Sequence, residues 1–152
     1  MLGILFPRVI DNTFRGQWIG LWLMAPLLFV KLGIAIVSMI DPRRANAADA
    51  IDHASFSEAA LREATTTTAL LGLLHLAIGL VGVLAMIRYR ALVPFIYLWL
   101  LAEFLARRAV LTLYPIDRVD GPSSGSLVNM VLLGLMVVGL LFSLWPRRRA
   151  PA

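Results

Sequence analysis

The chain alternates four long apolar segments with short polar ones, at about 17–40, 66–87, 91–113 and 127–145. Each has roughly the 20 residues that a helix needs to cross the hydrocarbon core of a bilayer. Trp18 and Trp22 stand at the start of the first segment, where aromatic side chains mark a membrane interface. The pattern predicts an all-α protein built as a four-transmembrane-helix bundle.

The segment before the first span has an amphipathic pattern of its own. Apolar residues recur there at every fourth position, with polar residues between them: Leu2, Phe6, Ile10 and Phe14. This spacing predicts a short N-terminal amphipathic interfacial helix, and a frayed N-terminal segment is the alternative. The expected organisation is an interfacial segment at 1–16, a transmembrane domain at 17–145 and a basic C-terminal tail at 146–152.

The polar connections carry signals for the helix ends. Residues 41–64 form the main polar loop, and its residues Ser55-Phe56-Ser57-Glu58 fit a capping box, which predicts that a helix begins there and runs into the second span. Pro94 suits the first turn of the third span, where its missing N–H costs little. Ser126 follows a turn at 121–126 and is the predicted N-cap of the fourth span.

Composition supports a membrane protein. The chain has 152 residues, of which 60% are hydrophobic and 15% are charged, and its mean hydropathy is +0.83. Soluble domains are about 45–50% apolar and about 25% charged. The net charge of +5 could suggest nucleic acid, but the chain lacks a basic stripe interleaved with polar and aromatic residues. We therefore expect membrane lipids as partners and no nucleic acid, and the absence of cysteine excludes disulfides and thiolate metal sites.

Arginines near the spans predict the orientation, because positive charges collect on the cytoplasmic side. Seven lie toward one side: Arg8, Arg15, Arg88, Arg90 and Arg147 to Arg149. Four lie toward the other: Arg43, Arg44, Arg62 and Arg118. The pattern predicts a multi-pass membrane protein with both termini in the cytoplasm.

Several ionisable groups fall inside the predicted spans, where each costs about 2.5–3.5 kcal/mol to insert. At about 1.5 Å per residue, Lys31, His75 and Glu103 lie roughly 18–21 Å from the cytoplasmic ends of their helices. Arg107 and Asn129 share a second level at roughly 24 Å. We expect a Lys31–Glu103 ion pair with His75 adjacent, while Arg107 shares the carboxylate and Asn129 contacts its guanidinium.

This polar layer has three interpretations. It fixes only helix register and the choice of helix partner, or it forms a working proton path or ligand contact. In the third interpretation, the groups extend separately to the membrane interfaces.

The second span has a face of small residues, formed by Gly72, Gly79 and Gly82 with His75 among them. Small residues allow close helix approach, so this face predicts a packing seam with one hydrogen-bonded histidine. An axial haem ligand is the sharper alternative for His75, but a second histidine would have to come from a second copy of the chain. No cofactor and no metal site is therefore expected.

Catalytic motifs are absent from the sequence. It contains no G-x-S-x-G, H-E-x-x-H, P-loop or dinucleotide fingerprint. Tyr97 and Trp99, in the middle of the third span, are expected to pack within the bundle. No catalytic residue is predicted.

Scattered short motifs carry a resemblance to known sequences. They are Asp11-Asn12-Thr13-Phe14-Arg15-Gly16, Leu21-Trp22, Lys31, Leu71 to His75, Val83, Arg88-Tyr89-Arg90, Pro94-Phe95, Arg107-Arg108, Leu113 to Ile116, Pro122 and Val128-Asn129. Over most of its length except the main polar loop at 41–64, the chain resembles a family of uncharacterised small bacterial four-span integral membrane proteins. The resemblance implies four spans and a place in the bacterial inner membrane, and it implies no activity.

Three functions remain open from the sequence. The leading one is a non-enzymatic accessory, assembly or interaction component of a membrane system, with a membrane-protein partner or a second copy of the chain. The second is a small transporter or proton-coupled subunit that uses the Lys31–His75–Glu103 layer. The third is a membrane-embedded lipid-modifying enzyme, with His75 and Glu103 as an acid–base pair.

Overall fold

The computed structural model describes residues 2–116 and 124–146, in which helices are joined by loops and turns and no strand occurs. This confirms the all-α class. The α-helices are α1 (Leu2–Leu5), α2 (Trp18–Ile40), α3 (Pro42–Ala48), α4 (Glu58–Arg88), α5 (Val93–Leu113) and α6 (Ser124–Leu144). Two short 3₁₀ helices are η1 (His53–Ser55) and η2 (Arg90–Leu92).

Three of these helices, α2, α4 and α6, are long and apolar enough to cross a membrane. Helix α5 equals α6 in length, with 21 residues each, but Glu103, Arg107 and Arg108 make it less apolar. Helix α4 has 31 residues, so it is about 46 Å long and exceeds a hydrocarbon core of about 30 Å.

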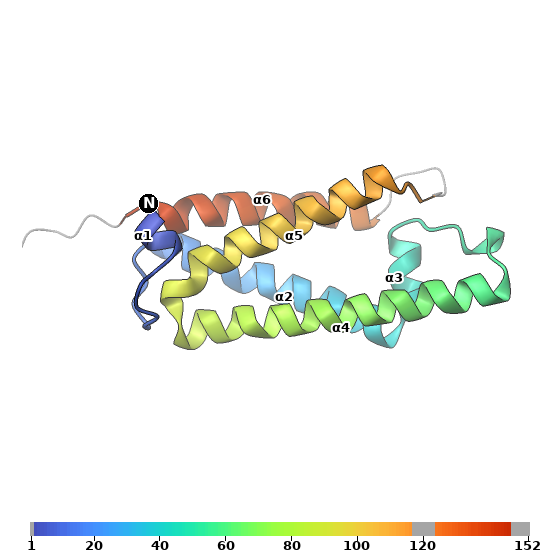
Figure 1. The fold of residues 1–152 in the computed structure, drawn as a ribbon, viewed down its shortest axis with the longest axis horizontal. Coiled ribbons are helices and arrows are strands. Elements are labelled where there is room, and N and C mark those ends of the chain that lie inside the picture. The colour runs from blue at the N-terminus through green and yellow to red at the C-terminus, as the bar shows by residue number, and fades with distance from the viewer. Residues whose placement is uncertain (1, 117–123, 147–152) are drawn as a thin grey trace, which may run out of the picture.

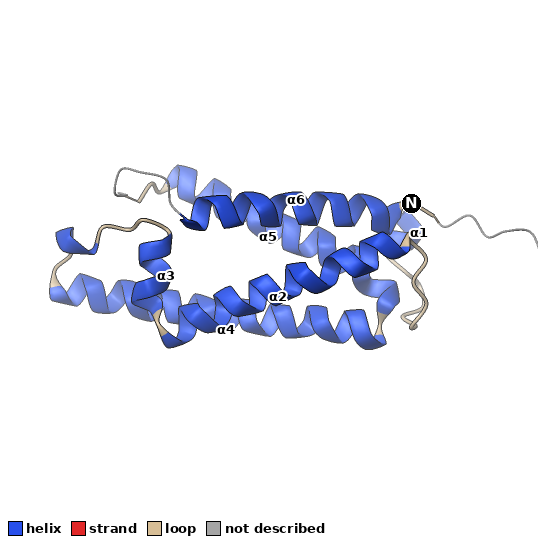
Figure 2. Ribbon diagram, turned by 180° about the vertical axis from the view of Figure 1, so that it is seen from behind, coloured by secondary structure: helices blue, strands red, loops and turns tan. Residues whose placement is uncertain are grey.

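The four long helices lie side by side along the long axis of the molecule (Figures 1 and 2). Helix α2 packs against both α4 and α6, and α5 packs against α6. One end of the bundle gathers the N-terminal segment, the α4–α5 connection and the end of α6. The opposite end holds α3 and the beginning of α4, which projects past α3 (Figure 1).

Helix α4 meets α2 through its glycines. A Cβ added at Gly72 would lie 2.9 Å from the carbonyl oxygen of Ala35 and 2.8 Å from Cβ of Ser38. Gly79 and Gly82 face leucine side chains of α2 in the same way. All three glycines are buried, so the two helices approach more closely than any larger residue would permit.

The contact between α2 and α6 is closer still. Gly16 and Gly20 lie against the backbone of Ser143, and a Cβ on Gly20 would stand 2.8 Å from the Ser143 nitrogen. On α6, Gly139 leaves room for the ring of Tyr97 from α5. The fully buried Tyr97 hydroxyl donates a 2.8 Å hydrogen bond to the Gly20 carbonyl oxygen and so joins three helices.

The N-terminal segment is less helical than its fourfold spacing suggests. Only Leu2–Leu5 are helical, and residues 6–16 form irregular structure and turns. Pro7 lacks the backbone N–H that would continue the helix. The Asp11 carboxylate then accepts hydrogen bonds from the backbone and hydroxyl of Thr13, which favours a turn over a helix. These hydrogen bonds also lower the pKa of Asp11.

The helix start predicted at Ser55-Phe56-Ser57-Glu58 is confirmed, although Ser57 caps it in place of Ser55, and the N-cap predicted at Ser126 is wrong. Helix α4 begins after Ser57, whose Oγ accepts from the Ala60 N–H at 3.2 Å. Ser55 instead ends η1, because the Asp52 carboxylate accepts from the Ala54 N–H and begins a separate turn before it. Helix α6 already includes Ser124, so Ser126 lies in its first turn and is not its N-cap.

The main polar loop at 41–64 contains a helix that the sequence analysis did not anticipate. The Asp41 carboxylate accepts from the Arg44 N–H at 3.1 Å, and Pro42 occupies the first turn of α3. Asn46 of α3 is buried and accepts a 2.7 Å hydrogen bond from the Thr68 hydroxyl on α4. The predicted basic tail beyond Pro146 lies outside the described residues, as does the first half of the predicted turn at 121–126.

Replacement of Gly72 by alanine tests the α2–α4 contact. We expect Gly72→Ala to lower the free energy of unfolding by about 1–3 kcal/mol, because the added methyl meets the α2 backbone. Gly33→Ala is the matched control, since nothing lies within 4 Å of its added Cβ. Its stability should be unchanged or higher by up to about 1 kcal/mol. Denaturation in mild detergent compares the two, and equal stabilities would contradict the tight contact.

Candidate functional site

Three helices each contribute one polar side chain to the middle of the bundle. Lys31 lies near the centre of α2, His75 near the centre of α4 and Glu103 near the centre of α5. Each sits in a continuous helix whose backbone hydrogen bonds are made internally, so the helices can hold these side chains at membrane depth. The remaining requirement is a partner for each side chain.

The structure brings Lys31, His75 and Glu103 together around one carboxylate. The Lys31 ammonium donates to Oε2 of Glu103 at 2.8 Å, and His75 Nε2 lies 3.2 Å from Oε1. Arg107 Nε lies 3.8 Å from the same Oε1, which is an ion-pair contact but too long for a hydrogen bond. We call these four residues the Glu103 cluster.

Most of the cluster is largely enclosed. The side chains of Lys31, Glu103 and His75 are 13%, 19% and 22% exposed, whereas that of Arg107 is 41% exposed. An ionised carboxylate can only accept hydrogen bonds, so His75 must carry a proton on Nε2 to form this one. The cluster thus sets the Lys31 ammonium and the Arg107 guanidinium against one carboxylate.

Arg107 does not reach Asn129. Asn129 is half-buried on α6, but no hydrogen bond between it and Arg107 occurs in the described part of the chain. The guanidinium turns back toward Glu103, one turn earlier on α5, and lies 5.9 Å from the centre of the Phe104 ring. The neighbouring Arg108 is exposed. The expected contact between Arg107 and Asn129 is therefore wrong.

Tyr97 and Trp99 take opposite positions. Tyr97 is fully buried between α2 and α6, whereas Trp99 is 53% exposed and borders the ring of Phe95. Residues two apart on a helix point about 200° away from each other, so both could not face the bundle. The expectation of bundle packing holds for Tyr97 and is wrong for Trp99.

The tie between Tyr97 and Gly20 is a site that the sequence analysis missed. A signal for the surrounding contact exists, because Gly16 and Gly20 are four residues apart, as are Gly139 and Ser143. Such pairs of small residues mark close helix contacts in membranes. They would have predicted the α2–α6 contact, although not the tyrosine that spans it.

The Glu103 cluster has the chemistry of an ionic clamp. Its carboxylate is already engaged by an ammonium and an imidazole from two other helices. Among the described residues, no group of three or more His, Cys, Asp and Glu side chains lies close enough to hold a metal ion. His75 and Glu103 are the two residues of the cluster that could ligate a metal, and each is occupied by the other.

Comparison with known proteins adds no assignment. No protein-family model, curated protein or solved structure matches this chain.

Replacement of Glu103 by leucine tests the clamp. Glu103→Leu should lower the free energy of unfolding in detergent by about 3–5 kcal/mol, because it leaves the Lys31 ammonium enclosed without a counter-ion. The control is Glu58→Gln, which removes an ion pair with Arg62 whose side chains are 80% and 76% exposed. That change should cost no more than about 0.5 kcal/mol.

A double variant separates the ion pair from general damage to the fold. Lys31→Leu combined with Glu103→Leu removes both charges, so it should recover much of the stability that Glu103→Leu loses. A double variant that is less stable than Glu103→Leu would contradict the clamp.

Proposed function

We propose that the chain crosses the bacterial inner membrane four times, with both termini in the cytoplasm. Three helices meet the length and apolarity that a span requires. We include α5 as the fourth span because its Glu103 is paired with Lys31 and His75, which reduces the cost of placing it in hydrocarbon. The distribution of arginines along the chain supports this orientation. We also propose that the chain belongs to the small four-span family that it resembles.

Within that topology, we propose a non-enzymatic accessory, assembly or interaction component of a membrane system. One observation carries this proposal: the Glu103 carboxylate is bound by residues of two other helices. A general acid or base must reach the proton that it transfers within hydrogen-bond distance. Here the Glu103 carboxylate joins three helices, and its two oxygens contact Lys31 and His75.

A second candidate is a proton-coupled subunit or small transporter. The observation in its favour is that none of the three enclosed side chains is sealed, since Lys31, Glu103 and His75 keep 13–22% exposure. His75 Nε2 and Glu103 Oε1 lie 3.2 Å apart, which is within the distance over which a proton passes between two groups. No observation favours the lipid-modifying enzyme over these two.

Cysteine labelling tests the topology, because the chain has no cysteine of its own. Single cysteines replace three exposed residues: Asn12 before α2, Ala59 at the start of α4 and Ile116 after α5. In intact cells, an impermeant thiol reagent should label positions 59 and 116, while position 12 should react only after permeabilisation.

Position 116 is decisive for the span count. If Ile116→Cys and Asn12→Cys react under the same condition, both in intact cells or both only after permeabilisation, then α5 does not cross the membrane. Labelling of Asn12→Cys alone in intact cells would reverse the proposed orientation.

A proton-flux assay decides between the two functions. Purified protein in liposomes with an internal pH-sensitive dye should show no proton conductance above empty liposomes. Mass spectrometry of material purified in mild detergent should find the same membrane-protein partner, or a second copy of the chain, in repeated preparations. Conductance that Glu103→Gln abolishes and Glu58→Gln preserves would favour the proton-coupled subunit. A monomer without partners would contradict the interaction role.

A further inference from the structure

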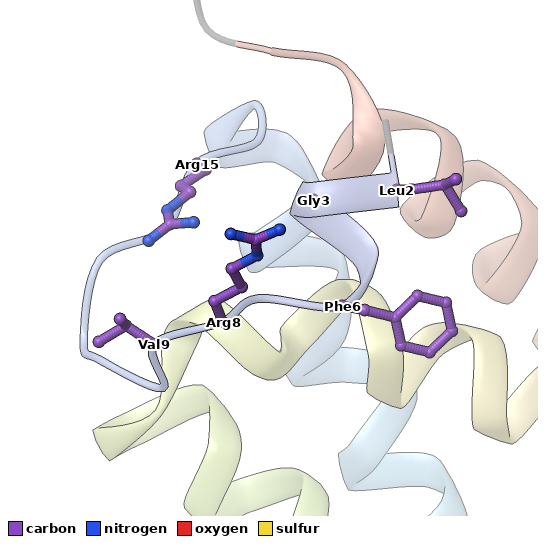
Figure 3. A pocket seen from close by; sticks show the side chains of 6 residues that line it. All are labelled: Leu2, Gly3, Phe6, Arg8, Val9 and Arg15. Atoms are coloured by element: carbon purple, nitrogen blue, oxygen red, sulfur yellow. The ribbon is translucent and has the colours of Figure 1, made fainter.

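A cavity of about 650 Å³ lies in the N-terminal segment, at the end of the bundle away from α3. Its lining combines two arginines with apolar side chains: Leu2, Gly3, Phe6, Arg8, Val9 and Arg15. Figure 3 shows that Arg8 and Arg15 extend from opposite parts of the same loop toward the space that the loop surrounds. None of these residues belongs to the Glu103 cluster.

Contacts with α5 and with the turn before it hold the cavity in place. The ring of Phe6 lies 5.9 Å from the ring of Phe95 in the first turn of α5. The carbonyl oxygen of Asp11 accepts a 3.3 Å hydrogen bond from the Ala91 N–H in the turn before α5. The loop is thus anchored to the bundle on both sides of Arg8, and the anchor at Asp11 lies four residues before Arg15.

The charge in the cavity is positive. Arg15 lies 3.7 Å from the Asp11 carboxylate, which also accepts two hydrogen bonds from Thr13. Arg8 forms no hydrogen bond or ion pair with any other residue that the structure describes. With one carboxylate against two guanidinium groups, the site has one excess positive charge and an arginine fork that matches a phosphate.

The surroundings of the cavity are apolar and exposed. Val9, which follows Arg8 in the chain, is 63% exposed, and Leu2, which also lines the cavity, is 75% exposed. Trp18 and Trp22, at the start of α2, are also exposed, and such residues mark the headgroup level of a bilayer. A ligand that fits both features is anionic at one end and apolar at the other. Such a ligand matches the site better than free phosphate does.

We propose that this cavity binds the headgroup phosphate of an anionic phospholipid, with Arg8 as the main contact and Arg15 as the second. Leu2 and Val9 lie against the apolar part of the same lipid. The site depends on residence in a membrane, but it is independent of the Glu103 cluster and of the proposed accessory role.

Native mass spectrometry of the full chain in mild detergent tests the site. The protein is mixed with equal amounts of phosphatidylglycerol and phosphatidylcholine, and the bound lipids are counted. Wild-type protein should retain one phosphatidylglycerol in preference to phosphatidylcholine. The double variant Arg8→Gln with Arg15→Gln should bind it about tenfold or more weakly, since each basic residue near a headgroup contributes roughly one kcal/mol.

The matched control is Arg43→Gln with Arg44→Gln. It removes two exposed arginines from α3, at the opposite end of the bundle, and changes the net charge equally. The control should retain phosphatidylglycerol as the wild type does. If both double variants lose phosphatidylglycerol equally, the effect is one of net charge and the proposed site is wrong. The site is also wrong if the wild-type protein shows no preference between the two lipids.

Two further measurements test the lipid as the occupant and Arg8 as its main contact. Displacement of the lipid by millimolar inorganic phosphate would show that phosphate alone fills the site and would overturn the lipid as occupant. The single variant Arg8→Gln, checked by its thermal unfolding against wild type, guards against loss of the fold. If this stable variant binds phosphatidylglycerol as tightly as the wild type, the proposed role of Arg8 is wrong.

Discussion

Helices in hydrocarbon gain nothing from burying apolar side chains against each other, because lipid tails are equally apolar. Close backbone approach and polar ties must hold such a bundle together instead. In this protein both devices meet on α2, whose two faces take the glycines of α4 and the Gly139–Ser143 part of α6. The leucine-rich outer surfaces of these helices remain exposed, as lipid-facing surfaces are in a membrane protein.

Helix α5 is attached to α2 by polar ties rather than by a glycine face. Tyr97 reaches the Gly20 carbonyl oxygen at one level, and Glu103 reaches Lys31 at a second level. The two ties follow the same order along both helices, so together they fix how far α5 can slide against α2. His75 adds α4 to the second tie, which makes Glu103 the side chain that three of the long helices share.

Much of the architecture was predictable because long apolar segments have few alternatives to helices. The Glu103 cluster was accessible for the same reason, since helix rise converts residue number into depth and unpaired charges at one depth must find each other. Depth alone does not give rotation about the helix axis, so Asn129 was wrongly assigned to Arg107, and Trp99 to the bundle interior. The capping errors arose where several Ser and Asp residues compete within a few positions, as they do around Asp52 and Ser57. Only the folded chain shows which of them wins.

The order of the clamp residues along the chain has a consequence for biogenesis. Lys31 and His75 belong to α2 and α4, which are synthesised before the less apolar α5. In the proposed topology, both partners of Glu103 therefore leave the ribosome before the costly acid does. Under that proposal, the ammonium and the imidazole that bind Glu103 are already part of the nascent chain when the less apolar α5 is made.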